Sequence, residues 1–269
     1  MLRKLLEHPL TRGCDVDDPQ TTLLRRRIIR QKGFLKQLYT EWYTLIARNL
    51  PPPDSGLALE LGTGAGFMAD VVRELVVSEV FLLPGVDLVL SGLRLPFRNG
   101  SLRGIAMTDT LHHIPDPGLF LNEAARCVRP GGRLVLIEPW VSPWSRWIYT
   151  HFHPEPFLPD RAEWSLPAAG PLSCANGAMP WIIFERDRAR FSAEFPCWNI
   201  ASIEPMMPFS YLLSGGISLR SLAPSRSYRY WRLVEACLQP WISSWAMFAL
   251  IVVKRTNIAA PLPRENDFG

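Results

Sequence analysis

Short apolar runs alternate with amphipathic stretches through the central part of this chain. Apolar runs flanked by turn formers predict strands, and apolar residues repeated every three or four positions predict helices. Strands and helices that follow one another in this way are typical of a parallel sheet covered by helices. The predicted strands are 57–61, 76–80, 86–90, 104–108, 133–138, 200–206 and 246–254, and the predicted helices are 67–75, 117–128, 181–195 and 228–238.

The same pattern divides the chain into regions. Residues 1–50 are expected to form a helical N-terminal arm. The Pro- and Gly-rich segment 51–56 is expected to end it. Residues 51–254 are expected to form the main domain, with insertions at about 140–180 and 208–240, and residues 255–269 predict a flexible tail. Only residues 81–85 separate the second and third strands, so the helix that would cross between them is predicted to be missing or reduced to a turn.

Composition narrows the class of protein. The chain has 269 residues, of which 48% are hydrophobic and 20% charged, which suits one globular domain with insertions. Its five cysteines are scattered without a Cys-x-x-Cys pair, so neither a disulfide framework nor a zinc site is expected. No apolar run is long enough for a signal peptide or a membrane span, and we expect a cytoplasmic protein. The basic face of the arm is expected to be a solvated surface, with a phosphate-binding patch or peripheral membrane contact as the alternatives.

The most informative motif is the glycine-rich turn that follows the first predicted strand. Gly62, Gly64 and Gly66 occupy alternate positions after Glu60, where missing side chains allow a sharp bend and close approach to a ligand. A dinucleotide fingerprint needs glycine at the first, third and sixth positions, and the sixth position here is Phe67. This spacing argues against a nicotinamide-dependent oxidoreductase.

The segment from Glu60 to Gly66 resembles the first motif of class I S-adenosylmethionine-dependent methyltransferases, and the segment 109–113 resembles the type 11 group of that family. The resemblance implies a Rossmann-like, doubly wound α/β sheet, mostly parallel with an antiparallel last strand. It also implies S-adenosylmethionine as the cofactor, held where the carboxyl ends of the strands meet. The predicted cofactor-binding residues are Glu60, Gly62, Thr63, Gly64, Gly66, Glu79, Ser91, Gly92 and Asp109.

Two of these residues need comment. Glu79, near the end of the second strand, is expected to accept hydrogen bonds from the ribose hydroxyls, and Asp87 is the second choice. Ser91 stands where the family usually has an aspartate that contacts the adenine amino group. A serine oxygen can accept one such bond, so the contact is expected to be weaker.

Methyl transfer requires alignment of the acceptor with the sulfonium methyl group, and a hydroxyl acceptor also benefits from a general base. His112, His113 and His153 are the predicted catalytic residues, because histidine titrates near neutral pH. Glu138 is expected to orient a histidine of the group at 151–155 or to pair with an arginine. The sequence predicts no metal site, because His151, His153 and Glu155 lie in a loop interrupted by proline.

The predicted function is therefore transfer of a methyl group to an oxygen, nitrogen or carbon atom of a small molecule. The Trp- and Pro-rich segment 140–181 is expected to form a lid over an apolar acceptor pocket, or else a packed subdomain. An RNA methyltransferase is the first alternative, although the Asn/Asp-Pro-Pro-aromatic motif of base-amine enzymes is replaced by 109–112, and no nucleic-acid partner is expected. A non-catalytic cofactor-binding module is the second alternative.

Overall fold

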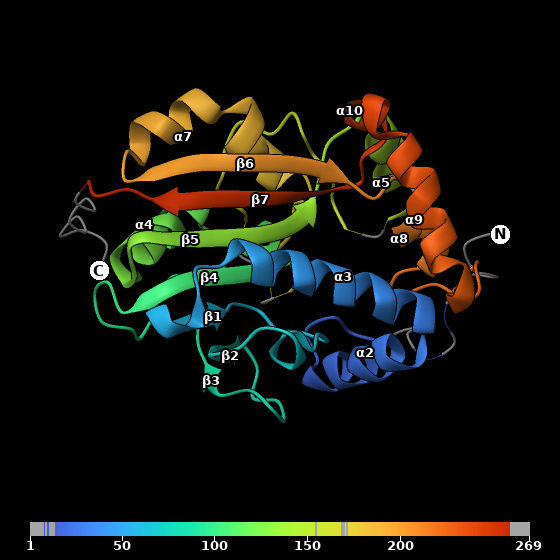
Figure 1. Ribbon diagram of the computed structural model, residues 1–269, viewed down its shortest axis with the longest axis horizontal. Coiled ribbons are helices and arrows are strands. Elements are labelled where there is room, and N and C mark those ends of the chain that lie inside the picture. Colours follow the sequence, from blue (N-terminus) through green and yellow to red (C-terminus); the bar gives the residue numbers. More distant parts are fainter. Residues whose placement is uncertain are drawn as a thin grey trace.

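The computed structural model describes residues 8, 10, 14–153, 155–167, 170 and 172–258, and its centre is a seven-stranded sheet. The strand order is β3-β2-β1-β4-β5-β7-β6, and helices cover both faces (Figure 1). The first five strands are parallel, and β7 is antiparallel to both of its neighbours, which confirms the predicted sheet. The strands are β1 Leu57–Glu60, β2 Leu75–Glu79, β3 Leu88–Val89, β4 Leu102–Thr108, β5 Val128–Pro139, β6 Trp198–Met206 and β7 Phe248–Arg255.

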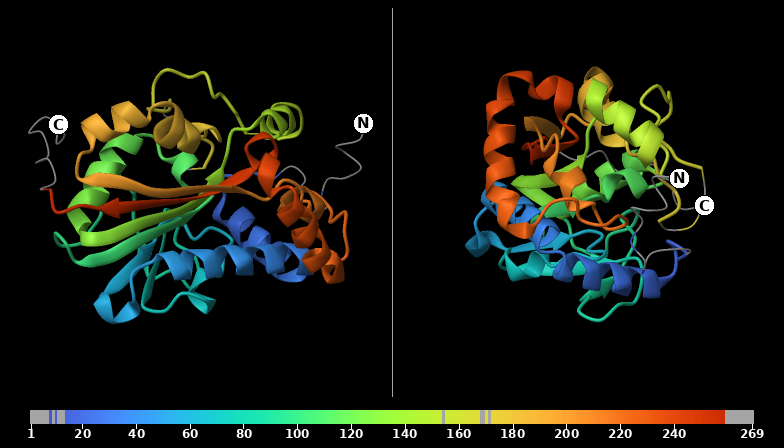
Figure 2. Two further views of the ribbon diagram at one scale, coloured as in Figure 1. Left: turned by 45° about the horizontal axis from the view of Figure 1, so that its top comes forward. Right: turned by 90° about the vertical axis from the view of Figure 1, so that its right-hand side faces the viewer.

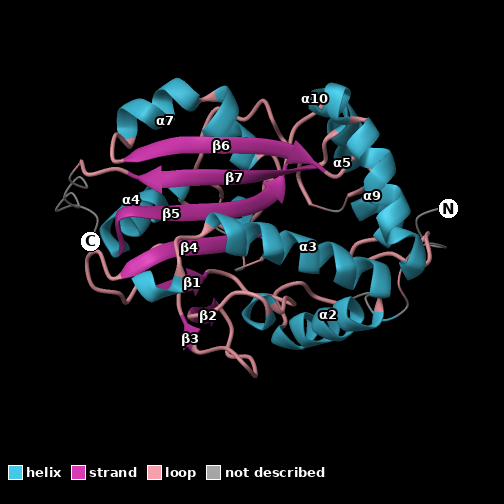
Figure 3. Ribbon diagram, viewed as in Figure 1, coloured by secondary structure: helices cyan, strands magenta, loops and turns pink. Residues whose placement is uncertain are grey.

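Helices pack on both faces of the sheet and gather beyond the carboxyl ends of the parallel strands (Figures 2 and 3). In these views α3 crosses one face, while α4 and α7 lie on the other. The helices are α2 Pro19–Gln31, α3 Gly33–Asn49, α4 Pro117–Cys127, α5 Pro143–Phe152, α6 Met179–Trp181, α7 Arg188–Glu194, α8 Ser210–Ser214, α9 Tyr228–Cys237 and α10 Ile242–Trp245.

The described part of the N-terminal arm packs directly on the sheet. In α3 the buried side chains include Leu35, Leu38, Trp42 and Ile46, which are spaced three or four residues apart and therefore share one face. The ring of Trp42 lies 4.8 Å from that of Phe248 in β7, so arm and sheet share one hydrophobic core. Within the arm, residues 1–7, 9 and 11–13 lie outside the described residues.

The predicted helix over 67–75 is wrong. A single 3₁₀ turn, Met68–Asp70, stands in its place, and β2 already begins at Leu75. Phe67, Met68 and Val72 have helical spacing, but their buried side chains fill the space beside β1 without a continuous helix. Glu74 has φ of +52°, a conformation that a helix cannot contain, and it ends the segment.

Other sequence-based expectations have mixed outcomes. The missing crossover helix between β2 and β3 is confirmed, because residues 80–87 contain no helix. The predicted helix 181–195 is divided into α6, a π-helical turn Ile182–Arg186 and α7. Strand β5 begins earlier than predicted and carries Gly131 at φ +82° within it.

Strand β7 is the last strand of the described chain. The Arg255 guanidinium at the end of β7 donates hydrogen bonds to the carbonyl oxygens of Ala125, Cys197 and Ile258, and so ties the described residues beyond the strand to the domain. The rest of the predicted tail, residues 259–269, lies outside the described residues. Within the described part of the chain, every helix is too short or too polar to cross a membrane.

Candidate active site

A cavity of about 430 Å³ opens beside the carboxyl ends of β1, β4 and β5. Every residue predicted from the sequence to bind the cofactor or to act in catalysis lies in its wall. They are Glu60, Gly62, Thr63, Gly64, Gly66, Glu79, Ser91, Gly92, Asp109, His112, His113 and His153. The structure thus brings together the segments that the sequence placed at one edge of the sheet, while their individual roles stay predictions.

The glycine turn has the left-handed backbone conformation that its composition predicts. Gly62 has φ of +72° and Gly64 has φ of +49°. A Cβ atom at Gly62 would lie 2.6 Å from Thr110 Cγ2, whereas no described atom lies within 4 Å of a Cβ atom placed at Gly64. Gly62 is therefore required by packing, and Gly64 presents bare backbone to open space in the cavity wall.

Glu79 fixes the tip of this turn. Its Oε2 accepts a hydrogen bond of 2.6 Å from the Gly64 N–H, and its Oε1 accepts one of 2.8 Å from the Val80 N–H. Asp87, the second choice for the ribose contact, accepts from the Val77 N–H at 2.8 Å and is not among the described residues that line the cavity. The geometry therefore favours Glu79 as the carboxylate at the cofactor site.

Glu60 is the most deeply buried carboxyl group of the turn, with 2% of its surface exposed. Burial raises its pKa to about 8, with the charge of Glu79 adding to the shift, while a hydrogen bond from Thr63 and the charge of Arg26 oppose it. Its Oε2 has no hydrogen-bond partner among the described residues. The carboxyl group is therefore largely protonated at neutral pH and can donate a hydrogen bond to a bound ligand.

We expect this raised pKa to make stability depend on pH. A carboxyl group that holds its proton more tightly when folded stabilises the fold fully below its unfolded pKa, and that stabilisation is lost as pH rises through about 8. The Glu60→Gln variant, which carries no such charge, should therefore be more stable than wild type at pH 9, by an amount on the order of 1 kcal/mol or more. Urea unfolding of both proteins at pH 5, 7 and 9 measures this. A wild-type minus variant difference that is the same at all three pH values would contradict it.

Ser91 and Gly92 occupy the stretch predicted to lie near adenine. The Ser91 Oγ accepts a hydrogen bond of 3.2 Å from the Leu93 N–H, so it is turned partly toward its own backbone. A Cβ atom at Gly92 would lie 3.0 Å from Leu61 Cδ2 and 3.4 Å from Ile114 Cδ1. Gly92 therefore lets this segment approach the end of β1 closely.

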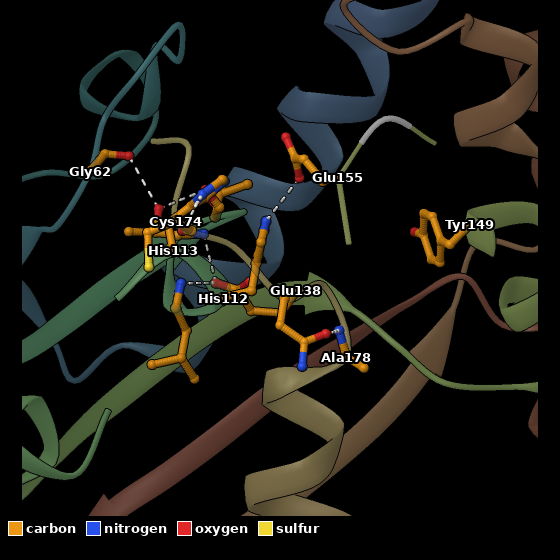
Figure 4. A network of polar contacts seen from close by, with 12 residues as sticks. Gly62, His112, His113, Glu138, Tyr149, Glu155, Cys174 and Ala178 are labelled. Carbon is orange, nitrogen blue, oxygen red and sulfur yellow. Dashed lines mark hydrogen bonds and ion pairs between the residues drawn. The ribbon is translucent and has the colours of Figure 1, made fainter. Parts of the chain in front are cut away.

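Histidines and carboxylates form a connected network at the other end of the cavity (Figure 4). His112 Nδ1 donates a hydrogen bond of 2.7 Å to Glu138 Oε2. Glu138 Oε1 in turn accepts from the N–H groups of Thr110 and Leu111, at 2.8 and 2.7 Å. On the other side of the ring, Nε2 lies 3.6 Å from Glu155 Oε2. Glu138 thus orients His112, and not a histidine of the 151–155 group as the sequence suggested.

The network separates the proton affinities of its members. Burial disfavours the charged ring of His112, but the hydrogen bond to Glu138 and the negative charges of Glu138 and Glu155 outweigh this and raise its pKa to about 10. Burial and the neighbouring charge of His112 lower the pKa of His113 to about 4. Burial raises the pKa of Asp109 to about 8, and the charge of His112 opposes this shift. His113 is therefore the neutral imidazole of the adjacent pair, with an electron pair available at neutral pH.

The lid segment supplies the remaining polar groups. The Cys174 carbonyl oxygen lies 3.3 Å from His113 Nδ1, and His153 Nδ1 accepts from the Glu155 N–H at 3.3 Å. His151 Nδ1 lies 2.8 Å from the Trp147 carbonyl oxygen, and His151 is not among the described residues of the cavity wall. The metal set considered from the sequence is therefore not assembled, because His151 lies apart from His153 and Glu155.

Sequence reasoning missed several residues of the cavity wall. They come from the arm, the lid and the second insertion, namely Arg25, Tyr39, Tyr43, Tyr149, Phe152, Phe157 and Tyr211. The spacing of the aromatic residues of α3 predicts a helix that packs on the core, but does not indicate that some of them line a cavity. The tryptophans of the lid, which suggested the acceptor pocket, pack elsewhere: Trp144 stacks on Trp147, and Trp164 on Phe195.

Comparison with known proteins identifies the family. Residues 34–168 match the family described as a methyltransferase domain. The chain is 30% identical over 106 residues to an uncharacterized methyltransferase of Mycobacterium sp. (strain KMS), which covers 34% of this chain and 42% of that protein. It is 25% identical over 122 residues to a demethylmenaquinone methyltransferase of Lactiplantibacillus plantarum, covering 42% and 49% respectively. The chain thus spans less than half the length of these relatives.

Solved structures share the fold. A geranyl diphosphate methyltransferase in complex with geranyl diphosphate and sinefungin gives a TM-score of 0.52 at 17% identity, covering 93% of this chain and 87% of that chain. Its complex with S-adenosylmethionine gives 0.51 at 17% identity, covering 93% and 96%. With the domain match extending over half its length and the strand order of the sheet, the chain belongs to the class I S-adenosylmethionine-dependent methyltransferases.

Proposed function

We propose that this chain transfers a methyl group from S-adenosylmethionine to a small molecule with a largely apolar body. The observation that carries the proposal is one continuous cavity with two kinds of wall. One wall is the glycine turn with Glu79 and Ser91, where the family motif places the cofactor. The other wall is mostly apolar and aromatic, formed by Ile148, Tyr149, Phe152, Phe157, Tyr211 and Met247.

The arrangement suits a reaction in which the protein mainly aligns its reactants. The acceptor atom must approach the methyl carbon opposite the departing sulfur, and the apolar side chains that α5 and α8 contribute to the cavity wall can hold it there and limit access of water. Where the acceptor is a hydroxyl, its proton must leave as the new bond forms. His113 and His153 are better placed to take up this proton than His112, whose ring lies between two carboxylates.

Calorimetry with S-adenosylmethionine tests the cofactor half of the proposal. We expect one molecule to bind per chain at micromolar to millimolar concentration, because Glu79 fixes the tip of the glycine turn in the cavity wall. No heat at millimolar cofactor would contradict the proposal. A protein that binds the cofactor but transfers its methyl group to nothing would be the non-catalytic module.

Incubation of cell extract with deuteromethyl-labelled cofactor tests the acceptor half. Mass spectrometry should find the label in a small organic molecule that partitions into an apolar solvent, because the acceptor wall is mostly apolar. The Gly64→Ala variant is the matched control and should label the extract more weakly than wild type when the labelled cofactor is limiting. Label in tRNA or ribosomal RNA would replace the small-molecule proposal by the RNA alternative.

A further inference from the structure

Two imidazoles and a carboxylate from separate segments converge on the acceptor side of the cavity. His112 and His113 follow β4, and Glu155 belongs to the lid segment after α5. One ligand atom from each lies within 4.8 Å of those of the other two, and all three residues line the cavity (Figure 4). We propose that His112, His113 and Glu155 bind a divalent transition-metal cation. This inference rests on the proposed function and replaces the expectation of a metal-free site.

The first supporting observation is the way in which His112 is held. Metal-binding histidines usually donate their second ring N–H to a carboxylate or a carbonyl oxygen, which fixes the ring and directs the other nitrogen to the metal. His112 Nδ1 makes such a bond to Glu138 Oε2 at 2.7 Å. Glu138 is fully buried and is itself fixed by the backbone N–H groups of Thr110 and Leu111. His112 Nε2 is thereby left to face Glu155.

His113 has the same kind of outer contact. Its Nδ1 lies 3.3 Å from the Cys174 carbonyl oxygen. A carbonyl oxygen can only accept a hydrogen bond, so Nδ1 carries the proton and Nε2 has the free electron pair that a metal needs. The rings of His112 and His113 have centroids 4.3 Å apart and planes inclined by 39°. Each imidazole therefore has its Nδ1 engaged by an acceptor, and its Nε2 is the nitrogen that would bind the metal. At His112 the cation would take the place of the proton on Nε2, which would be released to solvent.

The separation between His112 Nε2 and Glu155 Oε2 also suits a shared cation. At 3.6 Å it is too long for a hydrogen bond between nitrogen and oxygen. Two ligands that each lie about 2.0–2.1 Å from one tetrahedral zinc ion are about 3.4 Å apart. Glu155 is still 32% exposed at its side chain, so rotation of its χ angles can bring the carboxylate closer to both imidazoles.

The donor set selects the class of metal. Imidazole nitrogen favours Zn²⁺, Fe²⁺, Co²⁺ and similar ions, whereas Mg²⁺ and Ca²⁺ prefer oxygen ligands only. Two histidines and one glutamate are also a ligand set of catalytic zinc sites, which keep one position open for water or substrate. Here the cavity lies on the open side, because all three ligands are part of its wall.

A cation at this place would change how the acceptor loses its proton. An acceptor hydroxyl bound to the cation becomes more acidic and releases its proton to solvent. The oxygen then forms a bond to the methyl carbon, while the bond between that carbon and sulfur breaks and its electron pair stays on sulfur. In this case the imidazoles of His112 and His113 hold the cation and do not take up the proton.

Cobalt binding to the full chain tests the site. The protein is treated with a chelator, freed of it, and titrated with Co²⁺ while its visible absorption is followed. We expect one Co²⁺ per chain, with the intense bands of a four- or five-coordinate ion, and displacement by one equivalent of Zn²⁺. Glu155→Gln should weaken cobalt binding by more than about 100-fold. Loss of a residue that only orients a ligand weakens metal binding by about 10- to 100-fold, and loss of a ligand itself should cost more. His151→Ala is the matched control from the same segment and should leave binding unchanged, because its ring bonds to the Trp147 carbonyl outside the cavity.

The outcomes separate the two proposals. No visible bands, or cobalt uptake that both Glu155→Gln and His113→Ala leave unchanged, would overturn the metal site. Circular dichroism of each variant establishes that it is folded, and Glu155 is partly exposed, so its replacement is compatible with the fold. If the metal-free chain binds S-adenosylmethionine but takes up no cobalt, only the metal inference fails. If it binds cobalt at this site but no cofactor, the proposed function fails.

Discussion

Replacement of Gly64 by alanine should reduce the affinity for S-adenosylmethionine at least tenfold, which corresponds to about 1.4 kcal/mol. An added methyl group would meet no described protein atom within 4 Å, so it would project into the open space where the cofactor is expected. The φ of +49° adds a conformational cost that any residue with a side chain incurs. Calorimetry with the purified variant measures the affinity directly.

Gly131→Ala is the control for this experiment. Gly131 also has positive φ, +82°, and likewise has open space around its Cβ position, but it lies in β5 away from the cavity. Its replacement should lower thermal stability to a similar extent and leave cofactor affinity unchanged. Equal affinities in the two variants would mean that the cofactor does not approach the backbone at Gly64.

Replacement of Glu79 by alanine should weaken cofactor binding by about 10- to 100-fold, or 1–3 kcal/mol. The carboxylate accepts the N–H groups of Gly64 and Val80, so its loss frees the tip of the turn as well as removing the proposed ribose contact. Glu79→Gln should have a comparable effect, because its amide NH₂ would face one of these N–H donors. The measurement is again the dissociation constant for S-adenosylmethionine.

Asp87→Asn is the matched control for Glu79. Asp87 also accepts a backbone N–H, that of Val77, through its Oδ2, and an amide oxygen can replace that atom without a second donor facing it. We therefore expect the cofactor affinity of this variant to equal that of wild type. A larger loss in Asp87→Asn than in Glu79→Ala would move the ribose contact to Asp87.

The cofactor side of the cavity could be predicted because its signals are local. Glycines at alternate positions after Glu60, and acidic residues near strand ends, are short patterns whose geometry follows from backbone sterics and the direction of parallel strands. The helix predicted over 67–75 was wrong because a local pattern can fit two structures. The apolar spacing of Phe67, Met68 and Val72 is the same for a helix as for buried side chains on an irregular segment.

The acceptor side could not be predicted, because its residues are brought together by packing between distant segments. Tyr149 and Phe157 from the lid and Tyr211 from the second insertion all line the cavity, and no local pattern marks which face of these segments turns inward. The partner of Glu138 was missed for the same reason. The choice between His112 and the histidines of 151–155 depends on the position of the lid relative to β4.

The sheet is expected to be less stable against local opening at its β3 edge than at its centre. Strand β3 pairs with β2 at only two positions, Ser78 with Leu88 and Glu79 with Val89, and Leu88 and Val89 remain exposed. An edge with so few contacts opens more readily than the centre of a sheet. Glu79 belongs to this edge and also accepts a hydrogen bond from the glycine turn. A ligand that contacts both Glu79 and the turn would therefore reduce local opening at this edge of the sheet.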